Sequence, residues 1–122
     1  MAENPWANMS PGDPNRRVYK IEDFAIPHDG QVKPTPMYKG DELSSAVFCM
    51  LPGQEHEPHT HPTTTHAWLI MQGTGEVLME DGRCEAVRPG SVCIHEKTRL
   101  HGIRNTGADN LIYITISATA QQ

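Results

Sequence analysis

From residue 43 onward, short apolar or alternating runs are separated by turn residues, and no segment carries the 3.6-residue apolar stripe of a helix over three turns. Runs of this length and spacing are typical of an antiparallel β-sandwich or β-barrel. The break Asp81-Gly82 indicates a two-residue hairpin turn, because both positions of such a turn favour positive φ. The predicted strands are residues 43–51, 66–72, 76–80, 83–87, 91–95, 101–105 and 111–117.

Alternation along the last run, residues 111–117, separates two faces. One face carries Ile112, Ile114 and Ile116, and the other carries Leu111, Tyr113, Thr115 and Ser117. This pattern fits two arrangements. In one, the isoleucines lie in the core and the polar set faces water. In the other, the polar set lines an internal cavity, and the isoleucine face packs on a second sheet or subunit.

The first third of the chain differs in composition and lacks a regular hydrophobic pattern. Residues 1–17 are polar, contain three prolines and show no period, so we expect a flexible N-terminal arm. Residues 18–24 are a candidate edge strand, and the prolines and glycines of residues 25–42 predict a loop. We therefore expect one β-barrel domain over residues 18–122, with its principal strands in residues 43–117.

Composition and charge narrow the function classes. The hydrophobic fraction of 37% supports a modest core, and the net charge of −5 makes the chain a poor ligand for nucleic acid or anionic membranes. No apolar stretch approaches the length of a membrane helix, and the N-terminus lacks a signal-peptide pattern, so we expect a cytoplasmic protein. Three cysteines without a CxxC pair predict buried reduced thiols rather than a disulfide framework.

Histidine carries the strongest chemical signal. Four of the seven histidines lie within the eleven residues 56–66, a density typical of a metal site. On a strand His59 and His61 point the same way, so both imidazoles can chelate one ion. A turn through residues 62–65 would bring His66 beside them, and His101 is the leading candidate for a fourth ligand.

These residues resemble the two motifs of the cupin family. The first motif, Gly-x5-His-x-His-x3–4-Glu-x6-Gly, matches at Gly53, His59, His61 and Gly73, with His66 in place of the glutamate. The second, Gly-x5-Pro-x-Gly-x2-His-x3-Asn, matches at Gly90, His101 and Asn105. Glu96 and Thr98 replace the proline and glycine of that motif, so the loop before His101 departs from the family pattern.

The resemblance implies an all-β fold, a single jelly-roll-like cupin barrel that binds one divalent metal through His59, His61, His66 and His101. Four neutral imidazoles leave the ion its full charge, favour Fe, Cu, Ni, Zn or Co over Mg and Ca, and attract anionic ligands. His28, His56 and His95 match no motif position and are predicted not to be ligands. The family also implies a homodimer.

Strand parity and the resemblance together predict a mostly apolar substrate pocket. Its expected lining is Phe48, Met50, Trp68, Ile70, Ile103, Tyr113 and Thr115. The same side chains also fit a plain hydrophobic core. Glu55, Glu57, Glu76, Glu80 and Glu85 fit a solvated face. Without an internal carboxylate, proton transfer would fall to metal-bound hydroxide or to Tyr113, the candidate catalytic residue.

Three functions fit these expectations. The first is a metal-dependent oxygenase of the dioxygenase type, acting on a small anionic or enolisable molecule, since histidine-only cupin sites resemble those of diketone and thiol dioxygenases. The second is a Lewis-acid isomerase, cyclase or lyase whose activity survives without O2. The third is a cupin that binds or senses a small ligand without turnover.

Overall fold

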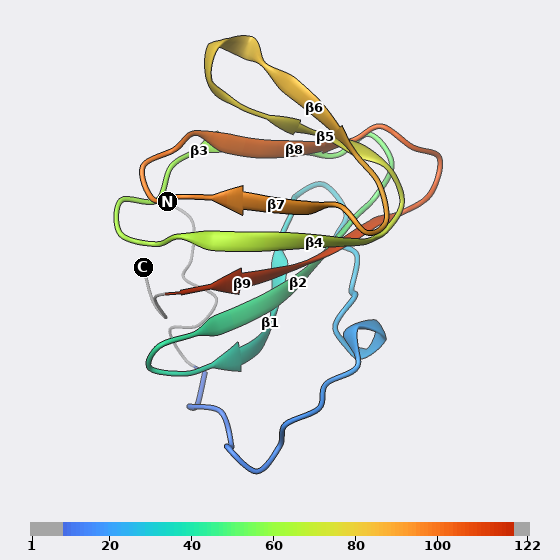
Figure 1. Cartoon of the computed structure of the whole chain (residues 1–122). Helices are drawn as coiled ribbons and strands as arrows, with labels where there is room; N and C mark the ends of the chain where they lie inside the picture. The colour runs from blue at the N-terminus through green and yellow to red at the C-terminus, as the bar shows by residue number, and fades with distance from the viewer. Residues whose placement is uncertain (1–8, 119–122) are drawn as a thin grey trace.

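A computed structural model describes residues 9–118 and consists of two antiparallel β-sheets (Figure 1). The five-stranded sheet has the order β1-β2-β9-β4-β7, and the four-stranded sheet has the order β3-β8-β5-β6. The elements in chain order are η1 (Ile21–Asp23), β1 (Pro34–Lys39), β2 (Ser44–Met50), β3 (Glu55–His59), β4 (His66–Gln72), β5 (Gly75–Leu78), η2 (Glu80–Gly82), β6 (Cys84–Val87), β7 (Val92–His95), β8 (His101–Asn105) and β9 (Leu111–Ser117).

The seven predicted strands are confirmed as β2 and β4 to β9, to within two residues at their ends. The hairpin prediction is also confirmed, since Asp81 and Gly82 have φ of 61° and 71°. Two strands were not predicted, β1 and β3. Both contain proline and both lie at a sheet edge, where a missing N–H does not interrupt the ladder.

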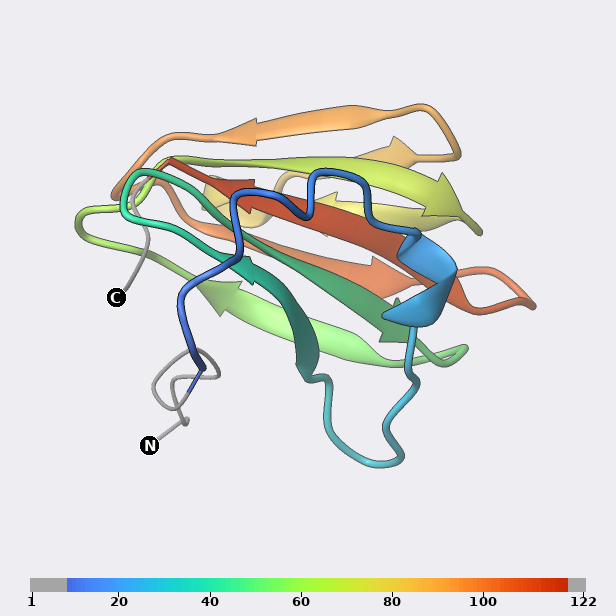
Figure 2. The same ribbon diagram turned by 90° about the horizontal axis from the view of Figure 1, so that it is seen from below.

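The prediction of an edge strand over residues 18–24 is wrong. This segment contains only the short 3-10 helix η1, and Val18 is 82% exposed, so no apolar face holds the segment against a sheet. The N-terminal segment runs outside the sheets, below β1 in Figure 1 and across it in Figure 2. Its Gly12 N–H donates to the Lys39 carbonyl over 2.8 Å. Residues 1–8 of the predicted arm lie outside the described residues.

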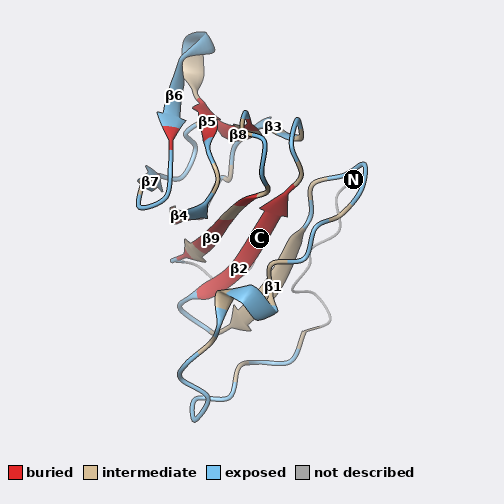
Figure 3. Cartoon of the chain, turned by 90° about the vertical axis from the view of Figure 1, so that its right-hand side faces the viewer, coloured by how far each residue is buried: buried red, intermediate tan, exposed pale blue. Residues whose placement is uncertain are grey.

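The core lies between the two sheets, and β2 with much of β8 and β9 is buried in Figure 3. The rings of Phe48 and Tyr113 stack at 4.9 Å with 6° between their planes. The two faces of β9 are now distinguished, because Leu111 and Tyr113 belong to the core cluster while Ile112 and Ile116 are only half-buried. Ile112 and Ile116 therefore lie on the outer face of the sheet, and alternation places Ile114 on the same face although it is only 8% exposed.

That outer face is apolar toward its β4 and β7 edge. Met71, Val92 and Ile94 expose 46%, 61% and 64% of their surface. The homodimer stays a prediction, which light scattering tests.

No helix in residues 9–118 is long and apolar enough to cross a membrane.

Candidate metal centre

Four strand ends gather the histidines at one end of the barrel. His59 ends β3 and is paired with His101 at the start of β8, while His66 begins β4 opposite His95 at the end of β7. Antiparallel pairing thus places residues far apart in sequence side by side.

A glycine permits the contact between β3 and β8. A Cβ atom at Gly102 would lie 2.6 Å from the His56 carbonyl oxygen and 2.7 Å from the Pro58 nitrogen. Both neighbours are backbone atoms that cannot rotate away, so only glycine allows β3 to lie this close. The register of β3 shifts between His56 and His59, which leaves His59 directly opposite His101.

His59, His61 and His101 form a possible three-histidine metal site. One ring nitrogen from each lies within 4.8 Å of the others, and the three come from β3, the loop after it and β8. His101 is buried, and the other two are half-buried. Imidazole nitrogens in this arrangement could bind a divalent transition metal.

Backbone carbonyls set the proton positions on two of these rings. His59 Nδ1 lies 2.8 Å from the Glu57 carbonyl oxygen, and His101 Nδ1 lies 2.8 Å from the Arg99 carbonyl oxygen. A carbonyl only accepts, so each Nδ1 carries the proton and donates it. The lone pair of each neutral ring is then on Nε2, as a metal ligand requires.

His66 lies next to this group. It is 8% exposed, and its Nε2 is 3.1 Å from His101 Nε2. Since the lone pair of His101 is on Nε2, the His66 Nε2–H donates to it in the metal-free protein, and His66 must move this proton to Nδ1 before its Nε2 can bind an ion. The inward position predicted for His66 is confirmed by its burial, and its role as a ligand stays a prediction.

Two further histidines extend the group into a cluster of six: His56, His59, His61, His66, His95 and His101. The His95 ring stacks on His101 at 4.5 Å and 16°, and the His56 ring lies 4.6 Å from His59. His95 Nε2 and His56 Nδ1 are buried without a hydrogen-bond partner among the described residues. The place of His95 in the cluster was not predicted from the sequence. The alternation of β7 could have found it, because Val92 and Ile94 point outward.

Burial disfavours the charged form of five histidines of this cluster. Desolvation, followed by repulsion from neighbouring imidazoles, lowers the pKa of His66 to about 3 and the pKa values of His56 and His95 to about 4. Desolvation also lowers the pKa of His101 to about 3 against the opposing hydrogen bond to Arg99, and it lowers the pKa of His61. Neutral rings keep their lone pairs available near pH 7.

The residues predicted to line a pocket lie beside the cluster. All except Thr115 belong to the hydrophobic core, and Thr115 donates a hydrogen bond to the Ala46 carbonyl at 3.4 Å. The Trp68 ring lies 5.6 Å from the ring of His101. Burial raises the pKa of the Tyr113 hydroxyl, which has no hydrogen-bond partner among the described residues. Their roles in binding and catalysis stay predictions.

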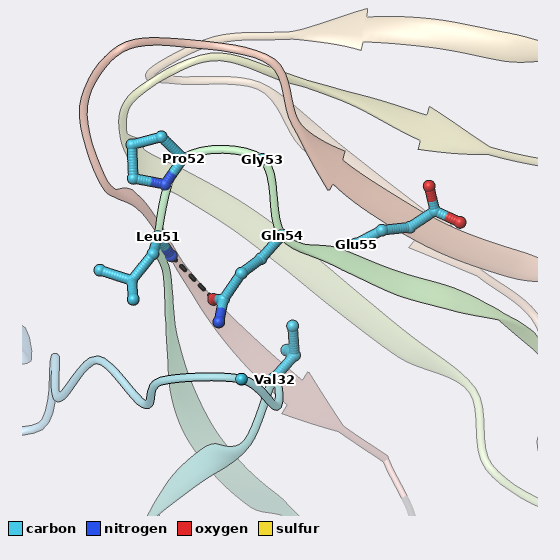
Figure 4. A pocket seen from close by; sticks show the side chains of 7 residues that line it. Val32, Leu51, Pro52, Gly53, Gln54 and Glu55 are labelled. Atoms are coloured by element: carbon cyan, nitrogen blue, oxygen red, sulfur yellow. Dashed lines mark hydrogen bonds between the residues drawn. The ribbon is translucent and has the colours of Figure 1, made fainter.

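A separate cavity lies at the turn between β2 and β3 (Figure 4). Val32 and residues 51–55 line it, and the Leu51 N–H donates to Gln54 Oε1 over 2.8 Å. None of the seven histidines lines this cavity. It therefore adds nothing to the chemistry of the histidine cluster.

We predict that the metal-free protein loses stability on mild acidification. The folded pKa values of about 3 to 4 lie below the ordinary value of 6.5, so the unfolded chain takes up protons first as the pH falls. Stability is then complete above about pH 6.5 and decreases toward pH 4. Urea unfolding in the presence of a chelator at pH 7.5, 6.0 and 5.0 measures how the free energy of unfolding depends on pH. The His95→Phe variant takes up one proton fewer on unfolding, so its dependence is weaker. A flat profile between pH 7 and 5 contradicts the prediction.

Comparison with known proteins agrees with this architecture. The Cupin domain family matches residues 46–117. A Klebsiella pneumoniae conserved protein with a double-stranded β-helix domain is 22% identical, with a TM-score of 0.82 over 85% of this chain and 90% of that one. A Bacillus halodurans protein is 23% identical, with a TM-score of 0.77 over 93% and 89%.

KdgF from Halomonas sp. is 20% identical, with a TM-score of 0.65 over 75% of this chain and 84% of that one. No curated protein matches the chain. At these identities the solved structures show the fold alone. The family match spans more than half of the chain and includes His59, His61, His66 and His101. This chain therefore belongs to the cupin family.

Proposed function

We propose that this cupin binds one divalent transition metal through His59, His61, His66 and His101 and acts as a dioxygenase. The observation that carries the metal site is the 3.1 Å separation of the His66 and His101 Nε2 atoms beside the other two rings. Nitrogens bound to one ion at about 2.0–2.1 Å lie roughly 2.8–3.4 Å apart at angles of about 90° to 109°. The observed separation fits two ligands of the same ion.

The donor set determines which chemistry this proposal allows. Four imidazoles without a carboxylate suit Fe, Cu, Ni or Zn and disfavour Mg and Ca, which prefer oxygen ligands. When bound, such an ion supplies an undiminished double charge that attracts enolates, phenolates or carboxylates, and Fe or Cu adds redox chemistry with O2. This charge argument supports a small anionic or enolisable substrate.

Core residues beside the histidines shield them from water and supply one hydrogen-bond donor. Phe48, Trp68 and Ile103 are at most 8% exposed and exclude water from the inner side of the cluster. Because burial raises its pKa, the Tyr113 hydroxyl stays protonated near neutral pH and can donate a hydrogen bond to a substrate oxygen. No side chain of the histidine cluster carries a negative charge that would repel an anion.

Removal of two ligands tests the metal site. We expect purified wild-type protein to carry about one Fe, Cu, Ni or Zn per chain, and the double variant His59→Ala/His61→Ala to carry none while retaining its β-sheet circular dichroism. Inductively coupled plasma mass spectrometry measures the metal. His28→Ala is the matched control, because His28 makes none of the ring contacts that join the other six histidines. Full metal retention by the double variant refutes the site.

A charge change at His66 tests the fourth ligand. His66→Glu retains the metal but lowers the charge of the metal centre by one, so azide binding to the Cu- or Fe-loaded protein weakens by about tenfold or more. His66→Gln, which adds no charge, separates this effect from the loss of the imidazole. Equal azide affinities for wild type and His66→Glu would show that His66 does not bind the ion.

Oxygen uptake tests the reaction class. We expect the Fe- or Cu-loaded protein to consume O2 with a member of a panel of diketones, thiols and phenols, and the His59→Ala/His61→Ala variant to consume none. The measurement uses an oxygen electrode, with product analysis of matched samples under argon. Product that still forms under argon would reject the dioxygenase and assign the site to lyase or isomerase chemistry.

A further inference from the structure

The loop before His101 contains a left-handed backbone conformation of the kind that glycine usually adopts, but no glycine occupies the position. In the second cupin motif this position is glycine, and here Thr98 occupies it with φ of 70°. The left-handed region is unfavourable for a β-branched residue, so neighbouring contacts must hold the loop in this conformation.

Those contacts join the loop to His61 and His101 directly and to His66 through its neighbour Thr65. The Thr98 N–H donates to the His61 carbonyl over 2.8 Å, and the Lys97 N–H donates to Thr65 Oγ1, next to His66, over 3.1 Å. Arg99 supplies the carbonyl that receives the Nδ1 proton of His101. A displacement of residues 97–99 would therefore move the hydrogen bond that orients His101.

Glu80 holds this loop from the β5–β6 turn. Its Oε2 accepts from Arg99 Nε and from the Leu100 N–H, each at 2.9 Å, and its Oε1 accepts from Arg99 Nη2 at 3.2 Å. The bidentate pair and the backbone bond fix the residues on both sides of the Arg99 carbonyl carbon. Both side chains are partly exposed, so the direct contribution of the ion pair to folding is small.

We propose that Glu80 is a positioning residue for the metal centre, which holds the Arg99 carbonyl where it keeps the proton of His101 on Nδ1 and the lone pair on Nε2. This inference rests on the proposed metal site. It assigns to Glu80 a role that a solvated surface carboxylate does not have. Loss of the hydrogen-bond partner behind a ligating histidine, here the Arg99 carbonyl, typically weakens metal binding by about 10- to 100-fold.

The chain offers a matched control. Glu76 lies on β5, four residues earlier, and pairs with Arg104 at 2.8 Å with a similar side-chain exposure of 38% against 34% for Glu80. No hydrogen bond joins Glu76 to the loop of residues 96–100 among the described residues. Glu76→Ala therefore removes one exposed ion-pair contact of Arg104, which keeps its 3.3 Å contact with Glu55, and breaks no hydrogen bond of the loop that orients His101.

The experiment compares Glu80→Ala, Glu80→Gln and Glu76→Ala with wild type. Nitrogen-15 NMR of the metal-free proteins at pH 7.5 reports the tautomer of His101, and competition titration with Zn²⁺ reports the affinity. We expect Glu80→Ala to populate both tautomers and to lose at least tenfold in Zn²⁺ affinity, while Glu76→Ala stays within twofold of wild type. Glu80→Gln recovers part of the loss, since its amide oxygen still accepts from the Leu100 N–H.

Two results would overturn the inference. One is an unchanged His101 tautomer in Glu80→Ala, and the other is an equal loss of affinity in Glu80→Ala and Glu76→Ala. The NMR measurement needs no metal. If wild-type protein fails to bind Zn²⁺, the proposed metal site fails on its own, while the tautomer of His101 still decides the role of Glu80.

Discussion

Packing neutral imidazoles against one another is the constraint on which the proposed metal centre depends. Six rings meet at one end of the barrel, and burial excludes the charged form of most of them. A single protonated ring would repel its neighbours and lose its lone pair. The fold must therefore hold the rings close together and shielded from water, with their nitrogens directed toward one another.

Strand pairing satisfies this constraint through the backbone. The ladder of β3 and β8 fixes His59 opposite His101, and the ladder of β4 and β7 fixes His66 opposite His95. Carbonyl groups of Glu57 and Arg99 then choose the tautomers of two rings. Strand register thus determines which histidines face one another, because hydrogen-bonded strands are rigid and their register admits no intermediate position.

The sequence was most informative where chemistry follows from local spacing. The spacing of His59, His61 and His101 predicted that they lie together, and the structure brings one ring nitrogen of each within 4.8 Å of the others. The alternation of β9 left two arrangements open, and the burial of Leu111 and Tyr113 in the core decides between them. Prediction failed where a tertiary partner decides. The prolines of residues 25–42 suggested a loop because the edge position of β1 was unknown, and Glu80 resembled a surface charge because Arg99 lies 19 residues away. Nothing in local spacing identifies a substrate.

Trp68 gives the histidine cluster an optical consequence. Its indole is 2% exposed and lies 4.3 Å from the ring of His95 and 5.6 Å from that of His101. The chain has only one other tryptophan, Trp6, which lies outside the described residues. Fluorescence from an indole at this position is sensitive to the charge and the unpaired electrons of an ion held by the adjacent imidazoles. The protein thus contains its own spectroscopic probe, with which filling of the cluster can be followed without an added dye.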